Sequence, residues 1–229
     1  MMNLNIQINT TTELIKPRSS EKLLGIVIKD DLKWAEYIQN NENSLIKQLN
    51  TRLNALRLVS QVASFKARLM VANGIFCSKL IFQISLWGGA EEYLLNSLQK
   101  VQNKAARCVA RRGIYCSAVE ILKQCGWLSV RQLVFFHSVT LIYKSIMTSY
   151  PKYIHNKLDM EFPYNTRLAQ SDSVRMGPTF KTRLELTERS FMNRATVCFN
   201  QLPPDLRKVE KLESFKIKLK KWVLENHKF

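Results

Sequence analysis

The spacing of apolar residues changes near residue 40, and this change constrains the fold more than any other feature of the sequence. Before it, apolar side chains alternate with polar ones at Leu4, Ile6, Ile8, Leu24, Ile26 and Ile28. A period of two is typical of strands. After it, apolar side chains recur every three or four residues at Leu45, Leu49, Leu53 and Leu56. That spacing is helical. The sequence therefore predicts a mainly α protein that begins with a short β-hairpin.

Helical spacing continues through much of the chain. Further helices are expected over residues 63–84, 92–112, 118–125, 128–147 and 212–225. Trp87-Gly88-Gly89 would end the first of these helices, and Ser129 is placed to cap the fourth. Trp87 is expected either as a core anchor or as a ligand contact. Phe135 and Tyr143 recur at helical spacing, which favours a place in the core.

The stretch from residue 151 to residue 183 has little periodicity. Pro151, Pro163 and Gly177-Pro178 interrupt it, which is typical of a linker or an open arm. Arg167, Arg175, Lys181 and Arg183 lie within it. They fit an arm that orders on a polyanion and equally a plain surface loop.

We expect a hairpin over residues 1–40, a helical domain over 41–150, and a linker with a basic helical tail over 151–229.

Composition fits a folded protein with a polyanionic partner. The chain has 229 residues, of which 46% are apolar, enough to build a core. Its 35 Lys and Arg residues exceed its 18 Asp and Glu residues, so the formal net charge is +17. Such an imbalance favours nucleic acid or an anionic membrane as partner. Because no apolar run approaches the length of a membrane helix and the first residues begin no signal peptide, we expect a cytoplasmic or nuclear protein.

Positive charge is concentrated where negative charge is absent. Residues 43–90 contain no Asp or Glu, and the basic residues in that interval are Lys47, Arg52, Arg57, Lys66, Arg68 and Lys79. Like charges repel one another, so a surface of this kind is disfavoured unless a polyanion neutralises it. We therefore predict that Arg52, Arg57, Lys66 and Arg68 bind nucleic acid.

The helix expected over residues 92–112 carries a basic stripe. At helical spacing, Lys100, Lys104, Arg107 and Arg111 fall within about 60° of one another, apart from the apolar sector. No acidic residue lies four positions away to neutralise the stripe. An ordinary solvated face and a phosphate-binding face both fit these residues. We include the four residues in the predicted nucleic-acid site.

The cysteines do not indicate a disulfide framework or a metal site. Their number is odd, at positions 77, 108, 116, 125 and 198, and no Cys-x-x-Cys pair occurs. Structural zinc sites usually need closely spaced Cys and His ligands, and His137, His155 and His227 lie far apart in sequence. We therefore predict reduced cysteines, no metal ligands and no cofactor.

The final third of the chain contains a series of short motifs in a specific order. They are Arg189-Ser190-Phe191, Arg194-Ala195, Asn200-Gln201-Leu202-Pro203 and Phe215-Lys216. This series resembles the tail of a LINE-type (non-LTR) retrotransposon reverse transcriptase. Leu23-Leu24-Gly25 and Leu98-Gln99-Lys100 extend the resemblance toward the amino terminus in the order of that family. The resemblance implies an RNA-directed DNA polymerase, with Leu24 and Gly25 in a primer-grip hairpin and a helical thumb after it.

The catalytic motif of that family is missing from this sequence. The family carries an aromatic-x-Asp-Asp motif whose paired carboxylates hold two metal ions. The adjacent acidic pairs here are Asp30-Asp31, which predicts a hairpin turn, and Glu91-Glu92. In addition, Thr11 stands where the family has a lysine near the incoming nucleotide. The resemblance thus implies a non-catalytic fragment, with Mg²⁺ needed only by the intact parent enzyme.

The resemblance also implies partners. An RNA or an RNA–DNA duplex would bind the basic helices, and a separate polypeptide carrying the palm would complete the enzyme. Two alternatives remain open at this point. One is a non-enzymatic helical adaptor whose basic, amphipathic last helix binds a protein partner, calmodulin or a membrane surface. The other is a relic reading frame with no selected role.

Overall fold

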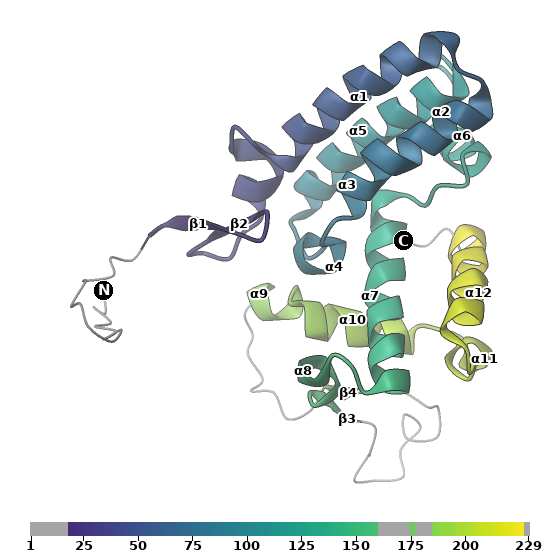
Figure 1. The fold of residues 1–229 in the computed structure, drawn as a ribbon. Helices are drawn as coiled ribbons and strands as arrows, with labels where there is room; N and C mark the ends of the chain where they lie inside the picture. Colours follow the sequence, from purple (N-terminus) through teal and green to yellow (C-terminus); the bar gives the residue numbers. More distant parts are fainter. Residues whose placement is uncertain (1–17, 160–174, 177–184, 227–229) are drawn as a thin grey trace.

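The structure is a computed structural model that describes residues 18–159, 175–176 and 185–226. It is mainly helical, with a short antiparallel hairpin ahead of the helices, as predicted (Figure 1). The predicted strand over residues 4–8 and the position of Thr11 lie outside the described residues.

The hairpin consists of β1 (Ser20–Leu23) and β2 (Ile26–Lys29), with Leu23 paired to Ile26. Leu24 and Gly25 form the two-residue turn between them, at φ values of 48° and 86°. Two positive φ values are typical of a type I′ turn, whose twist matches that of the strands. The expectation that Leu24 belongs to a strand is therefore wrong, because the alternating pattern begins in β2 at Ile26.

A second turn follows the hairpin at Asp30-Asp31. The amide of Leu32 donates to the carbonyl of Lys29 across this turn. Asp30-Asp31 was expected to be the hairpin turn that joins the two strands, but it follows β2 instead. The chain then enters a short π-helix, η1 (Glu36–Asn40), whose Tyr37 and Ile38 are buried.

The first core lies among the helices that follow. These are α1 (Leu45–Val62), α2 (Phe65–Ala72), the π-helix η2 (Asn73–Cys77), α3 (Ser78–Ile81), α4 (Ile84–Trp87), α5 (Glu92–Ala110) and α6 (Ala118–Gln124). The buried leucines at 45, 49, 53 and 56 of α1 belong to this core, together with the buried face of α5. α1 and α5 run side by side in the same direction (Figure 1).

The single helix expected over residues 63–84 is instead a rod made of α2, η2 and α3. Its buried residues Ala72, Phe76, Leu80 and Ile84 recur every four residues, which exceeds the 3.6 residues of an α-turn. A π-turn contains more residues than an α-turn, so η2 keeps the spacing aligned with the core. The rod then breaks at Gln83, which adopts a left-handed conformation at φ 54°.

A second core forms around α7 (Val130–Thr148). Ser129 caps this helix as predicted, and together with Gln132 it forms a capping box. The later elements are α8 (Lys152–His155), β3 (Leu158–Asp159), β4 (Arg175–Met176), α9 (Glu185–Glu188), α10 (Phe191–Asn200), α11 (Pro204–Arg207) and α12 (Leu212–Glu225). Both α10 and α12 pack against α7 (Figure 1).

The expected last helix is confirmed as α12, and its apolar face packs against α7. Phe215, Leu219 and Val223 are buried, and the Phe215 ring stacks on Tyr143 of α7 with 3.8 Å between centroids. Phe135 and Tyr143 are core residues, as expected. The tail therefore docks on the helical body.

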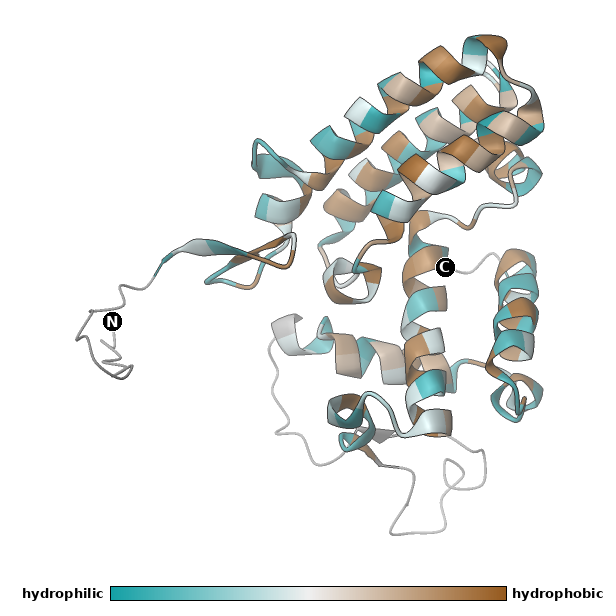
Figure 2. Ribbon diagram, in the orientation of Figure 1, coloured by the Kyte–Doolittle hydropathy of each residue, from teal (hydrophilic) through white to brown (hydrophobic). Residues whose placement is uncertain are grey.

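The two cores meet at α7, along which Figure 2 shows apolar residues on successive turns. Val130 and Val134 belong to the first core, and Phe135 and Val139 belong to the second. The described part of residues 151–229 thus contributes to the second core together with α7, and β3 pairs with β4. Of the predicted arm, Arg167, Lys181 and Arg183 lie outside the described residues.

Candidate nucleic-acid interface

Two of the predicted nucleic-acid ligands bind the carboxyl ends of helices instead. Arg68 is buried, and its guanidinium donates to the carbonyl of Val109 over 2.7 Å and to that of Ala63 over 2.6 Å. Arg111 donates to the carbonyls of Ser60 and Gln61 near the end of α1. Terminal helix carbonyls lack partners within the helix and carry partial negative charge, which these arginines neutralise. Arg68 and Arg111 thus hold α1, α2 and α5 together.

The basic stripe of α5 therefore retains two free cations. Lys100 and Lys104 are exposed, and within the described ranges neither forms an ion pair. Arg107 is half-buried and its Nη2 donates to the carbonyl of Cys116 over 3.4 Å. The expectation of a four-residue phosphate stripe is therefore narrowed to Lys100 and Lys104.

Arg57 lies on α1, the helix that packs against α5. The contact of Arg111 with Ser60 fixes the alignment of α1 and α5, and Arg57 and Arg107 each lie one turn before that contact. Arg57 is exposed and donates to Asn54 over 2.9 Å. We call Arg57, Lys100 and Lys104 the α5 face. Lys66 is also exposed, on α2.

A second group of cations gathers at the hairpin. Lys22 of β1, Arg52 of α1 and Lys79 of α3 come from three separate elements, and we call them the tip cluster. Burial lowers the pKa of Lys79, and the charges of Arg52 and Lys22 lower the same pKa further. Among the described residues, no carboxylate raises the pKa of Lys79. The fold thus places Arg52 and Lys22 within electrostatic reach of Lys79.

The hairpin turn lies at the same place. Gly25 faces the ring of Phe82, which a Cβ added to the glycine would approach to 3.6 Å. The Nζ of Lys79 lies 5.2 Å from the centroid of that ring. Leu24 is 84% exposed beside them. The structure therefore brings the predicted residues Leu24, Gly25 and Arg52 together with cations that the sequence had not assigned to the site.

Sequence reasoning missed Lys22 and Lys79 as members of one site. Lys79 lies in the interval without acidic residues, which was a usable signal. Lys22 belongs to residues 1–40, which contain five basic and five acidic residues, and only the pairing of β1 with β2 carries it toward α3. Arg52 also has a structural contact, since its Nη1 donates to the carbonyl of Ile75 over 2.6 Å.

The motif residues of the final third join the two cores. Arg189 forms an ion pair with Glu91 at 3.7 Å, and Arg194 donates to the carbonyl of Ser85 over 2.8 Å. Ala195 is fully buried, as is Phe215 in the second core. These contacts give the named motif residues a role in packing. Arg189, Arg194, Ala195 and Phe215 thus have structural roles in the fold.

Trp87 is a core residue. Its side chain is fully buried and its Nε1 donates to the carbonyl of Phe82 over 2.9 Å. Of the two expectations for this tryptophan, the core anchor is the one that the fold satisfies.

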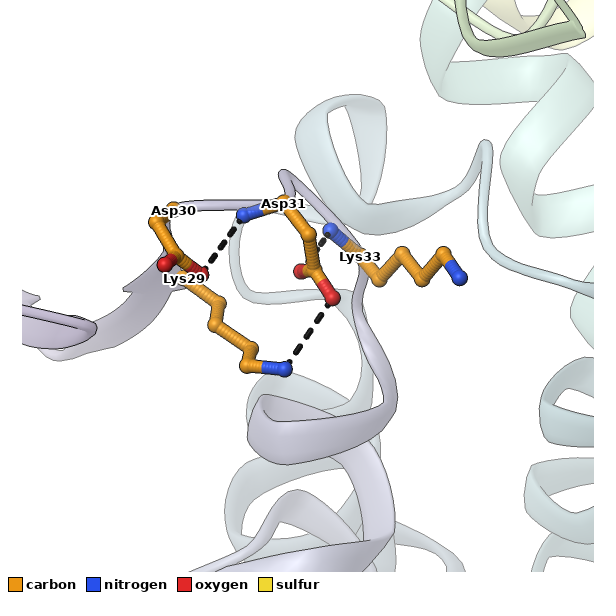
Figure 3. Close-up of polar contacts among 4 residues, drawn as sticks. All are labelled: Lys29, Asp30, Asp31 and Lys33. Atoms are coloured by element: carbon orange, nitrogen blue, oxygen red, sulfur yellow. Dashed lines mark hydrogen bonds and ion pairs between the residues drawn. The ribbon is translucent and has the colours of Figure 1, made fainter. Parts of the chain in front are cut away.

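The residues present do not fit the magnesium site of a polymerase. Figure 3 shows that Asp31 accepts the amide of Lys33 and the ammonium of Lys29, each over 3.0 Å, while Asp30 accepts the amide of Asp31 over 2.9 Å. The backbone amide of Lys33 and the side chain of Lys29 lower the pKa of Asp31. In the other acidic pair, Glu91 binds Arg189 and Glu92 binds Arg131. Both pairs are thus committed to turns and ion pairs.

The cysteines are free thiols in buried or half-buried positions. Burial raises the pKa of Cys77 to about 12 and that of Cys125 to about 11. A protonated thiol is a weak nucleophile and a weak ligand, so both are inert at neutral pH. Among the residues that the structure describes, no group of three or more His, Cys, Asp or Glu side chains is arranged to hold a metal ion.

Comparisons with known proteins add no family assignment. No protein-family model matches the chain, and neither curated proteins nor solved structures give a match. None of the helices in the described ranges combines the length and the apolar character that crossing a bilayer requires.

Proposed function

We propose that this protein binds the phosphate backbone of an RNA or an RNA–DNA duplex, as a non-catalytic, thumb-like part of a LINE-type reverse transcriptase. The observation that carries the proposal is the tip cluster. Three cations come from three elements there, and the pKa of Lys79 is lowered first by burial and then by the charges of Arg52 and Lys22. A phosphate backbone would supply the missing counter-charge.

The α5 face extends the proposed interface along the bundle. Lys100 and Lys104 are exposed on α5, and Arg57 is exposed on α1, which packs against α5. Arg52 points to the side of α1 that faces η2. Phosphate contacts of lysine and arginine position a duplex without reading its sequence. The proposed binding is therefore governed by the form of the nucleic acid rather than by its bases.

Binding to a labelled RNA–DNA primer–template tests this function. The informative variant combines Lys22→Gln with Lys79→Met, which removes two charges and keeps an apolar chain over Phe82. Its matched control combines Lys218→Gln with Lys220→Gln on the exposed side of α12 and removes the same charge. We expect at least a fivefold loss of affinity in the first variant and less than a twofold loss in the control. Equal losses in both would contradict the assignment.

Completion by a palm-containing chain is a separate part of the proposal. Co-expression with such a chain is expected to restore primer extension with Mg²⁺, because the carboxylate pair would come from the partner. A complex that forms without extending the primer would reject this part and leave nucleic-acid binding untouched.

The adaptor alternative requires a revised surface. The apolar stripe of α12 is buried against α7, so a partner helix has no access to it in the folded chain. An adaptor would use the outer side of α12, where Ile217 is 73% exposed. An Ile217→Glu variant that loses a protein partner while retaining RNA affinity would favour the adaptor over nucleic-acid binding.

A further inference from the structure

The connection between α5 and α6 presents an aromatic side chain to solvent. Tyr115 is 97% exposed and its neighbour Ile114 is 75% exposed. Large apolar side chains are usually covered in a folded protein, and Tyr115 is the most exposed large apolar side chain in the described ranges. No ring stacking or hydrogen bond of its side chain occurs within the described part of the chain.

The two ends of this loop are fixed to the bundle. Arg111 donates to the carbonyls of Ser60 and Gln61 on one side of Tyr115, and Arg107 donates to the carbonyl of Cys116 on the other. The amide of Cys116 also donates to the carbonyl of Gly113 over 3.3 Å. Tyr115 therefore projects from an anchored loop, so ordering it against a ligand costs little conformational entropy.

The surroundings of Tyr115 are basic. Arg112 is exposed and forms no ion pair within the described residues. Lys104 of the α5 face lies about two turns before the loop on the same helix. Aromatic side chains beside cations are the components of single-strand sites, in which bases stack on rings and phosphates bind the cations. An uncharged protein surface would cover the exposed ring but would leave the adjacent cations without counter-charge. An anionic lipid surface would supply that counter-charge, and the test below distinguishes it from a single strand.

We infer that Tyr115 is a stacking platform for an unpaired base of single-stranded RNA or DNA, with Arg112 bound to the adjoining phosphate. The inference rests on the proposed function, because the α5 face would hold the duplex that leads into this single strand. It adds a preference for a duplex that carries an unpaired extension, which phosphate contacts alone do not provide.

The test compares a blunt RNA–DNA duplex with the same duplex carrying a single-stranded RNA extension. Tyr115→Ala is expected to reduce affinity for the extended probe by about tenfold, the scale of one stacked base, and to leave the blunt probe unchanged. Tyr115→Phe retains the ring and is expected to bind like the wild type. Tyr153→Ala is the matched control, because Tyr153 is 69% exposed on α8, a helix that joins the second core through Ile154.

The possible results distinguish a failure of the stacking site from a failure of the proposed nucleic-acid binding. Equal affinity of Tyr115→Ala and the wild type for the extended probe would overturn the stacking site alone, provided that the tip-cluster variant still loses affinity. No effect of either variant would overturn the proposed function as well. Tyr115-dependent binding to anionic lipid vesicles, with unchanged binding to the extended probe, would replace the stacking site by a membrane contact.

Discussion

Gly89 lies directly against the guanidinium of Arg194, at the point where the two cores meet. A Cβ added to Gly89 would lie 2.6 Å from Nη1 of Arg194 and would also collide with the backbone carbonyl of Arg189. The same guanidinium donates through Nη2 to the carbonyl of Ser85. The glycine therefore permits the close approach through which α10 docks on the first core.

Gly89→Ala is expected to lower the free energy of unfolding by about 1–3 kcal/mol, because the added methyl group forces the backbone of Arg189 away. Gly74→Ala is the control, since no atom lies within 4 Å of a Cβ at that position and alanine favours a helical conformation. Urea denaturation measures both. A loss of stability in Gly74→Ala equal to that in Gly89→Ala would contradict the steric explanation.

Arg68 and Lys104 were predicted for the same role, and the fold separates them. Arg68→Ala is expected to destabilise the protein by about 2–4 kcal/mol, because it leaves the carbonyls of Val109 and Ala63 without partners. Lys104→Ala is expected to change stability by less than about 0.5 kcal/mol, as for most exposed positions. Thermal unfolding distinguishes the two variants, and similar shifts in both would contradict the structural role of Arg68.

Lys79→Met is expected to raise stability while it lowers affinity for RNA. The pKa of Lys79 is lowered by burial and by Arg52 and Lys22, so its charged form is destabilising in the fold at neutral pH. The gain should be largest in low salt and should shrink as added salt screens the repulsion. Urea midpoints at two salt concentrations measure the effect. A destabilised variant at low salt would show that the tip cluster is not repulsive.

His137 makes stability depend on pH. Burial lowers its pKa from the ordinary value of 6.5. Because the unfolded chain binds the proton more readily, stability is retained above about pH 6.5 and is lost as the pH falls below it. His137→Gln is expected to flatten this dependence between pH 7.5 and about 5.5. Parallel pH profiles of the variant and the wild type would contradict the assignment.

The regular helices could be predicted because local patterns specified them. The Ser129 side chain caps α7, and Gln132 three residues later completes the capping box. The apolar residues of α12 have helical spacing from Leu212 to Val223. Both signals lie within a few residues of the element they define. The irregular rod of α2, η2 and α3 could not be predicted, because its π-turn depends on aligning Phe76 and Leu80 with a core that other helices complete.

Only part of the candidate site could be predicted, because contacts between distant elements determine which basic side chains are free. A sequence shows that Arg68, Arg111 and Lys104 are basic but not which helix carbonyls lie near them. The backbone ends of α1 and α5 determine that two of these side chains are bound by the fold and that the third remains free. Likewise, Lys22 reaches the tip cluster through a strand pairing that its own neighbours in sequence do not indicate.

Neutralisation of phosphates by the tip cluster is tested most directly by the salt dependence of binding to an RNA–DNA primer–template. The slope of log K against log salt is about −0.9 for each phosphate neutralised on a duplex. The Lys22→Gln, Lys79→Met variant is expected to have a slope smaller in magnitude than that of the wild type by roughly 0.9 for each cation removed. Identical slopes for the two proteins would show that these cations do not contact the nucleic acid.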